Sequence, residues 1–531
     1  PLETAGPRVV RPRSGRAAIG AGMAMVALAA FAGWWAYQTS RVRSARQALP
    51  QLRELVQSEK YSSAFRMFRD LEPLLSGDSE FEAARTTLFV PATIRTAPDG
   101  ADLYVKGYDE PKAGWVFIGR SPLENFRLPL GYYRWRAVKP GFTPFEGAAG
   151  GGFEEVTFIL FPEGAIPEGM VNVPKDAVRF SGTTAPVDAF FIDRYEISNR
   201  QFKRFLDAGG YAARQYWREP FITGARTLTW EDGMAQLRDA TGRPGPSTWQ
   251  LRSYPKRQDD YPLTGVSWYE ALAYAAWAGK ELPTVHHWRK AAPGGIFSEI
   301  LDQSNFSNRQ VAPVGTYTGI GDFGTYDMAG NVREWCWNAV GDHRRYILGG
   351  AWNEPNYMYQ NPDAADPFDR SAINGFRLMT RSTVDSMPPA LLAPVEELAR
   401  DFRGVKPVSD AEFAIYRRFY EYDRSDLKPV LESADDSSES WRIERVSYAA
   451  AYGGERIIAY LFLPRHVSPP YQTVVYFPHS GGEFLRSFEQ SEMNYLGFVV
   501  KSGRALLFPM YKGTYERRLE RAPEGPNARR D

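Results

Sequence analysis

The sequence G-T-Y-D-M-A-G-N-V-R-E-W-C-W at residues 324–337 is followed by I-L-G-G-A-W at 347–352 and by G-F-R-L at 375–378. The glycines of these blocks indicate turns with positive φ or a close approach of two backbones. The tryptophans supply large surfaces for burial in a region with little regular periodicity. These residues are Gly330, Gly349, Gly350, Gly375, Trp335, Trp337 and Trp352. The stretch therefore predicts a loop-rich core held by aromatic packing and side-chain hydrogen bonds.

The three blocks, in this order, resemble the formylglycine-generating enzyme (sulfatase-modifying factor) family. Upstream, V-D-A-F-F-I-D-R-Y-E-I-S-N at 187–199 is similar to an early segment of that family. P-L-T-G-V-S-W at 262–268 and A-G-K-E-L-P-T at 278–284 then follow in the family's order. The resemblance covers roughly residues 166–382, and it implies a loop-rich, C-type-lectin-like fold.

The sequence departs from the family where copper would bind. The resemblance implies two copper-binding cysteines between the second and third blocks, but residues 353–374 contain no Cys. The chain's one cysteine, Cys336, lies between two tryptophans, and a cysteine in such surroundings is most often a small buried apolar residue. One thiolate cannot form a two-thiolate Cu(I) site. We therefore expect the fold without copper and without the oxidase reaction.

The resemblance also implies a calcium site, because family members hold calcium with oxygen ligands near the D/N-x-x-G-N-x-x-E-W block, and loop oxygens suit this hard cation. Carried over onto this sequence, the ligands are carboxylates and carbonyls, with a companion pair upstream. They are Asp327, Glu334, Gly330 and Val332, with Asn305 and Phe306 as the companion pair. The alternative is that Asp327 and Glu334 accept hydrogen bonds from the backbone without a metal.

Composition excludes several classes of function. A net charge of +1 over 531 residues gives no electrostatic reason to expect nucleic acid as a partner. One Cys excludes intrachain disulfides, and five His without H-E-x-x-H or C-x-x-C motifs argue against a zinc site. Adjacent His286 and His287 do not share a helix face, so we expect them to be exposed rather than metal-binding. Helix caps are predicted at Ser198-x-x-Gln201, at Ser267-x-x-Glu270 and at Thr284.

The N-terminal segments predict an anchored, modular protein. Residues 1–16 form a basic arm, and the uncharged residues 17–37 predict a membrane-spanning helix rather than a signal peptide. Apolar residues at helical spacing predict a helical hairpin over 41–89. Short alternating segments over 91–162, with L-P-L-G-Y-Y-R at 128–134, resemble a PEGA domain, a small β-sandwich found outside the cytoplasm.

The C-terminal segments predict a linker and an incomplete enzyme domain. Residues 383–440 form the linker, with a helix over 411–420 and an acidic, Ser-rich loop over 432–440. Residues 441–531 resemble the start of an α/β-hydrolase, because paired strands are followed by two apolar strands and an H-S-G-G loop. The candidates for its oxyanion hole are His479, Ser480, Gly481 and Gly482. No G-x-S-x-G nucleophile motif follows them, so no catalytic triad is predicted.

Together these segments predict a multidomain α+β protein. Its expected function is sensing or binding by a single-pass protein of the bacterial inner membrane, with the C-terminal part outside the cytoplasm. The membrane and an unidentified protein or cell-envelope ligand are the expected partners. The order of segments resembles bacterial receptor-type serine/threonine kinases, so we expect a kinase upstream. Hydrolysis by a complete C-terminal domain is the alternative, and formylglycine formation is disfavoured by the missing cysteines.

Overall fold

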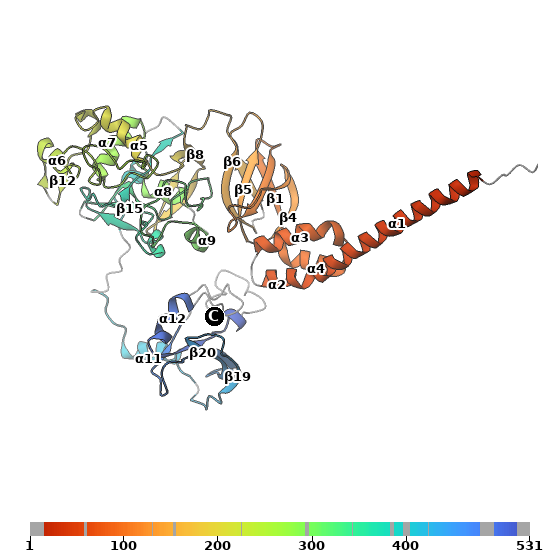
Figure 1. Ribbon diagram of the computed structural model, residues 1–531. Helices are drawn as coiled ribbons and strands as arrows, with labels where there is room; N and C mark the ends of the chain where they lie inside the picture. Colours follow the sequence, from red (N-terminus) through yellow and green to blue (C-terminus); the bar gives the residue numbers. More distant parts are fainter. Residues whose placement is uncertain are drawn as a thin grey trace, which may run out of the picture. The chain divides into compact units, whose positions relative to one another are not determined.

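The structure is a computed structural model shown in Figure 1. It describes residues 15–57, 61–129, 131–151, 155–224, 226–292, 297–341, 343–382, 387–396, 404–422, 424–477 and 493–517. The chain divides into two compact units, Pro1–Ala399 and Arg400–Asp531.

The first unit begins with four helices. They are α1 (Gly15–Gln47), α2 (Leu49–Gln57), α3 (Tyr61–Leu75) and α4 (Ser79–Leu88). The membrane-spanning prediction for residues 17–37 falls inside α1 and is corrected: among the described residues, no helix has the length and apolar character needed to cross a membrane. Ala and Gly make up twelve of those twenty-one residues, and such small side chains bring little apolar surface.

Seven short strands follow the helices and form two sheets. The strands are β1 (Phe89–Ala97), β2 (Asp102–Gly107), β3 (Val116–Arg120), β4 (Leu123–Pro129), β5 (Gly131–Val138), β6 (Phe145–Gly151) and β7 (Glu155–Ile159). Their orders are β4-β1-β7 and β3-β2-β5-β6. Buried Phe65 and Phe68 of α3 share one apolar cluster with Trp135 of β5 and Phe158 of β7. The amphipathic helices thus bury their apolar faces against the sheets.

The strands and helices of residues 170–381 are short and are separated by long irregular segments (Figure 1). The strands are β8 (Met170–Val173), β9 (Asp176–Phe180), β10 (Thr183–Val187), β11 (Phe190–Asp193), β12 (Ile222–Thr223), β13 (Arg226–Thr227), β14 (Arg333–Val340), β15 (Arg344–Leu348), β16 (Asp363–Ala365), β17 (Asn374–Gly375) and β18 (Met379–Arg381). The helices are α5 (Asn199–Asp207), α6 (Trp230–Gln236), α7 (Trp268–Ala278), α8 (Val285–Ala291) and α9 (Phe297–Asp302). The two larger sheets have the orders β18-β11-β8 and β16-β15-β14-β17.

The predicted helix caps are confirmed. Ser198 and Ser267 each form a capping box, the first with Gln201 at the start of α5 and the second with Glu270 at the start of α7. Thr284 caps α8 by accepting a hydrogen bond from the backbone N–H of His287. These contacts satisfy N–H groups that a helix start otherwise leaves without partners.

The prediction that His286 and His287 are exposed is wrong. Both are buried, at 1% and 3% exposure, because α8 lies between β9 and β14 and has no solvent face at these positions. The His287 ring packs edge-on against Phe190, and its Nδ1 lies 2.6 Å from the Thr284 hydroxyl. Burial lowers the pKa of His287 to about 4, so this ring is neutral at pH 7.

Leu391 and Val395, in the early part of the predicted linker, belong to the core instead. Helix α10 (Pro389–Leu392) buries Leu391, and Val395 is buried beyond it. The Asn338 side chain of β14 donates to the carbonyls of Leu391 and Ala393, each at 2.8 Å. The 383–440 linker prediction therefore extends too far toward the N-terminus, because this segment supplies acceptors for a buried amide.

In the described residues, the second unit contains a mixed five-stranded β-sheet together with helices. Its elements are α11 (Asp410–Arg418), β19 (Val430–Asp435), β20 (Trp441–Ala449), β21 (Arg456–Pro464), β22 (Thr473–Val475), α12 (Met493–Lys501) and β23 (Ala505–Pro509). The strand order is β19-β20-β21-β23-β22, with β22 and β23 parallel. The predicted pairing of β20 with β21 is confirmed, whereas part of the predicted acidic loop at 432–440 is strand β19, which pairs with β20.

Candidate functional site

A buried ion pair links the first and third sequence blocks, through Glu334 of residues 324–337 and Arg377 of residues 375–378. Arg377 donates to both oxygens of Glu334, from Nε at 2.7 Å and from Nη2 at 2.6 Å, and both side chains have 0% exposure. Trp288 of α8 donates its indole N–H to Glu334 at 2.7 Å. Arg377 also donates to the carbonyls of Asp193, Arg194 and Tyr326. Such full satisfaction is what allows an ion pair to remain buried.

Two more carboxylates, those of Asp327 and Glu196, lie close enough to Arg377 to interact with it electrostatically. Asp327 Oδ2 accepts from the backbone N–H of Gly315 at 2.6 Å. Glu196 accepts from the Asn331 amide at 2.7 Å and from the Val332 N–H at 3.0 Å. Asp327 and Asn331 both adopt positive φ, 56° and 59°, a conformation that Asp and Asn tolerate better than most residues.

The cluster of Glu196, Asp327, Glu334 and Arg377 contains three carboxylates and one guanidinium. Glu196, Asp327 and Glu334 face one guanidinium, that of Arg377, which stabilises all three carboxylates electrostatically. Burial raises the pKa of Asp327 to about 6. Burial also raises the pKa of Glu196, and the charges of Asp327 and Glu334 raise it further. A proton or another cation is therefore needed to balance this cluster at neutral pH.

The residues of the predicted calcium site lie close together in the structure, but some of their oxygens already accept hydrogen bonds from the protein. Asn305 and Gly330 form a parallel bridge, and the Asn305 carbonyl accepts from the Asn331 N–H at 3.0 Å. Both Glu334 oxygens are engaged by Arg377, so this carboxylate does not suit a calcium ion. In the described ranges, no three His, Cys, Asp or Glu side chains gather closely enough to hold a metal. The calcium site stays a prediction, with Asp327 as the carboxylate that Arg377 does not bind; its predicted residues are Asn305, Phe306, Asp327, Gly330, Val332 and Glu334.

The single thiol is part of the core. Cys336 lies in β14 with 0% exposure, and its neighbours in the apolar cluster include Met328, Val340 and Leu348. Burial raises the thiol's pKa well above its ordinary value, and the charge of Glu334 raises it further. The reactive thiolate is therefore disfavoured, as we expected for a small buried apolar residue.

The segment that lacks the copper cysteines carries ion-paired side chains. Within residues 353–374, Glu354 and Asp363 both bind Arg333 of β14, and Glu354 does so through both of its oxygens. Arg370, in the same segment, donates to both oxygens of fully buried Glu270 at 2.8 and 2.9 Å. Charged pairs thus fix this segment onto β14 and α7, where the resemblance implies a thiolate pair.

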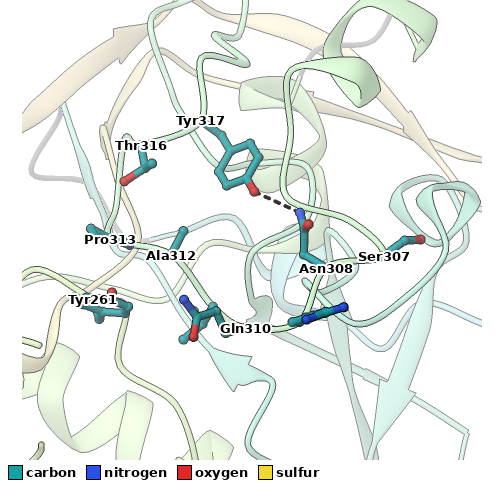
Figure 2. Close-up of a pocket in the computed structure, with 10 residues that line it drawn as sticks. Tyr261, Ser307, Asn308, Gln310, Ala312, Pro313, Thr316 and Tyr317 are labelled. Atoms are coloured by element: carbon teal, nitrogen blue, oxygen red, sulfur yellow. Dashed lines mark hydrogen bonds between the residues drawn. The ribbon is translucent and has the colours of Figure 1, made fainter.

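A pocket of about 770 Å³ opens beside this segment. It is lined by Tyr261, Ser307, Asn308, Arg309, Gln310, Val311, Ala312, Pro313, Thr316 and Tyr317. Figure 2 shows Asn308 reaching toward Tyr317, whose hydroxyl accepts from the Asn308 amide at 2.9 Å. The loop joins the 353–374 segment through the backbone, because Ser307 N–H donates to the Glu354 carbonyl at 2.9 Å.

Sequence reasoning missed several residues of this site. No role was assigned to Glu196, Arg333, Glu354 or Arg370, although Glu196 and Arg333 lie in segments that resemble the family. Their partners are as much as 136 residues away in the chain, so no local spacing reveals the contacts. The predicted oxyanion residues His479, Ser480, Gly481 and Gly482 lie outside the described residues, so that prediction is not tested.

A loop-rich α+β domain, with one buried thiol and ion pairs in the cysteine-free segment, defines a sulfatase-modifying-factor type of domain that lacks the copper ligands. Comparison with known families agrees, because residues 153–382 match the family described as "Sulfatase-modifying factor enzyme 1-like domain". The chain belongs to this formylglycine-generating enzyme family. The matched range begins at residue 153, just before β7 and earlier than the predicted start at residue 166.

The relatives include enzymes, an inactive form and kinases. A formylglycine-generating enzyme of Thermomonospora curvata is 32% identical over 230 residues, which cover 33% of this chain and 73% of that protein. An "Inactive C-alpha-formylglycine-generating enzyme 2" of Bos taurus is 28% identical over 241 residues, covering 38% and 74%. The serine/threonine-protein kinase pkn1 of Chlamydia caviae is 35% identical over 156 residues, covering 28% and 22%. The chain thus spans only about a quarter of the kinases that it matches.

Proposed function

We propose that residues 166–382 are a recognition domain that does not oxidise cysteine and that belongs to a larger bacterial signalling protein of the serine/threonine kinase type. The observation that carries this proposal is the pair of carboxylates, Glu354 and Asp363, that hold Arg333 in the segment where the family's oxidases place cysteines. The one thiol, Cys336, is sealed in the core. The domain keeps its fold and a solvent-open pocket, which are what binding requires.

The relatives support this reading from two directions. The bovine relative is named an inactive member, so the fold persists in proteins without the oxidase reaction. The chlamydial relatives are named kinases, and the matched part accounts for about a quarter of their length. A kinase segment in the same gene is therefore expected, with a Gly-rich loop and an H-R-D motif. Reading the gene upstream of Pro1 tests this part of the proposal.

The oxidase alternative is tested directly with purified protein. The protein is supplied with Cu(I) and oxygen, incubated with a cysteine-bearing peptide, and the peptide is analysed by mass spectrometry after aldehyde trapping. We expect no aldehyde, because one buried thiol cannot replace a thiolate pair. A copper-loaded oxidase of this family serves as the positive control. Aldehyde formed by wild-type protein and lost in Cys336→Ser contradicts the proposal.

Calcium at Asp327 is a separate proposal. Its support is the excess of acid over base among Glu196, Asp327, Glu334 and Arg377, which a divalent cation at Asp327 balances. Thermal unfolding at pH 7.5 is compared with calcium and with chelator. Calcium is expected to raise the melting temperature of wild-type protein and not of Asp327→Ala. An unchanged melting temperature in wild-type protein sinks this proposal.

Hydrolysis is a second candidate function of the whole protein. The observation that favours it is the order β20-β21-β23-β22, in which a parallel pair follows antiparallel strands, as the opening strands of an α/β-hydrolase require. The test is an esterase and peptidase assay on a chain extended beyond Asp531, with the next G-x-S-x-G serine replaced by alanine as the control. The candidate is ruled out if the extended chain has no esterase or peptidase activity, or if the serine-to-alanine variant is as active as the extended chain itself.

A further inference from the structure

The pocket beside Tyr261 carries one cation and no acid. Of its ten lining residues, Arg309 is the one with a cationic side chain, and that side chain is exposed. Among the described residues, no carboxylate lies within ion-pair distance of Arg309, whereas nearby Arg200 is paired with Asp260. An unpaired guanidinium in an acid-free pocket attracts anions, and its planar fork matches a carboxylate or phosphate.

The loop backbone adds donors beside this cation. The N–H groups of Arg309, Gln310 and Val311 make no hydrogen bond to protein in the described part of the chain. The N–H groups on either side of this run are used: Asn308 donates to the Trp352 carbonyl at 2.7 Å, and Ala312 donates to Asn331 Oδ1 at 3.0 Å. These unused N–H groups are available as further donors to an anion held by the Arg309 guanidinium.

Buried side chains hold the loop in place from behind. The Asn331 amide both donates to and accepts from the backbone of Ala312. Asp327 accepts from the Gly315 N–H, and the Asn305 amide donates to the Gln310 carbonyl at 3.4 Å. Because Asn305, Asp327 and Asn331 are themselves buried, the pocket is shaped before a ligand arrives, which reduces the entropy lost on binding.

The remaining lining suits the uncharged part of an organic molecule. Val311, Ala312 and Pro313 give an aliphatic wall, and the rings of Tyr261 and Tyr317 lie across the pocket from one another (Figure 2). A pocket of about 770 Å³ is larger than a single inorganic anion needs and falls in the range of small-molecule sites.

We propose that this pocket binds a small organic anion through a carboxylate or phosphate group. Arg309 and the N–H groups of residues 309–311 hold that group, and the aliphatic wall and tyrosines contact the rest of the ligand. The proposal rests on the proposed recognition function, and it names the class of ligand that the domain recognises.

Isothermal titration calorimetry on the full chain tests the site with two probes, sodium phosphate and sodium citrate, each in a background of sodium chloride at matched ionic strength. Three proteins are compared: wild type, Arg309→Gln and Arg226→Gln. Arg226 is an exposed arginine of β13 that does not line the pocket, so it is the matched charge control. We expect Arg309→Gln to weaken binding of at least one probe by about tenfold or more, and Arg226→Gln to leave it unchanged.

Each result decides the proposal. Phosphate alone identifies a phosphate site, citrate alone a carboxylate site, and both probes a general oxyanion site, provided that Arg309→Gln weakens the binding. Binding that is equal in wild type and Arg309→Gln, equally weakened in Arg226→Gln, or absent for both probes overturns the proposal. Aldehyde formation in the copper assay sinks the recognition function instead, whatever the pocket binds, so the two failures are distinguishable.

Discussion

Two arginine–carboxylate pairs in one domain, each with a fully buried glutamate, differ in charge balance. Arg370 and Glu270 form a balanced pair, and Glu270 also accepts from Ser267 and Tyr211, which are neutral donors. Arg377 and Glu334 form an equally direct pair, but Glu196 and Asp327 add two further carboxylates to the neighbourhood of Arg377. The balanced pair fastens α7 to the 353–374 segment. The unbalanced cluster is where protons or cations have an effect.

The largest expected effect on stability comes from removing the guanidinium of Arg377 from the unbalanced cluster. Arg377→Met leaves three buried carboxylates without their cation, so we expect a loss of about 4–5 kcal/mol in unfolding free energy. Urea denaturation measures it. The matched control is Arg381→Met, which breaks the part-exposed pair with Glu281 and is expected to cost about 1 kcal/mol or less. Equal losses in the two variants contradict the electrostatic account.

Removing the base of the balanced pair is expected to cost less. Arg370→Met leaves one buried carboxylate, and the Ser267 hydroxyl and N–H at 2.8 Å and the Tyr211 hydroxyl at 2.5 Å still donate to it. We expect a loss of about 3 kcal/mol by the same urea titration. Arg200→Met, at an exposed pair with Asp260, is the control and is expected to change little. A larger loss for Arg370→Met than for Arg377→Met reverses the comparison.

The pH dependence of stability sharpens the same comparison. Burial raises the pKa of Asp327 from 3.8 to about 6, so folding favours its protonated form. This contribution is fully present below pH 4 and is lost as pH rises through 6. Asp327→Asn cannot ionise, and it is expected to be more stable than wild type at pH 7.5 in chelator, by on the order of 2 kcal/mol.

Urea titrations at pH 4.5 and pH 7.5 measure that difference. Asp188→Asn, at an exposed carboxylate of the same domain, is the control and should follow wild type at both pH values. If Asp327→Asn loses as much stability as wild type between the two pH values, the excess charge at this cluster is not what limits stability.

The sequence patterns predicted structural features that depend on residues close together in the chain. The boxes at Ser198 and Ser267 are local, because a side chain and the N–H that it caps lie three residues apart, and both are present. The pairing of β20 with β21 also follows from adjacent apolar runs. The core position of Cys336 followed from its flanking tryptophans.

Contacts between distant segments were not predictable in this way. His286 and His287 lie on a short helix whose faces are covered by β9 and β14, and helical spacing does not reveal how many faces are covered. Glu334 carries the residue type of a calcium ligand, but Arg377, 43 residues later, takes both of its oxygens. Arg370 reaches Glu270 across 100 residues. One sequence carries no record of these pairings.

The central claim is that residues 353–374 carry ion-paired side chains where the resemblance implies the copper cysteines, and that the chain's one thiol, Cys336 of β14, is buried in the core. Competition of the purified protein against a chromophoric Cu(I) chelator tests it most directly, with wild type and Cys336→Ser compared at pH 7.5. The account predicts that both proteins leave the chelator complex intact at one equivalent of protein. Withdrawal of one equivalent of Cu(I) by wild type, lost in Cys336→Ser, would contradict it.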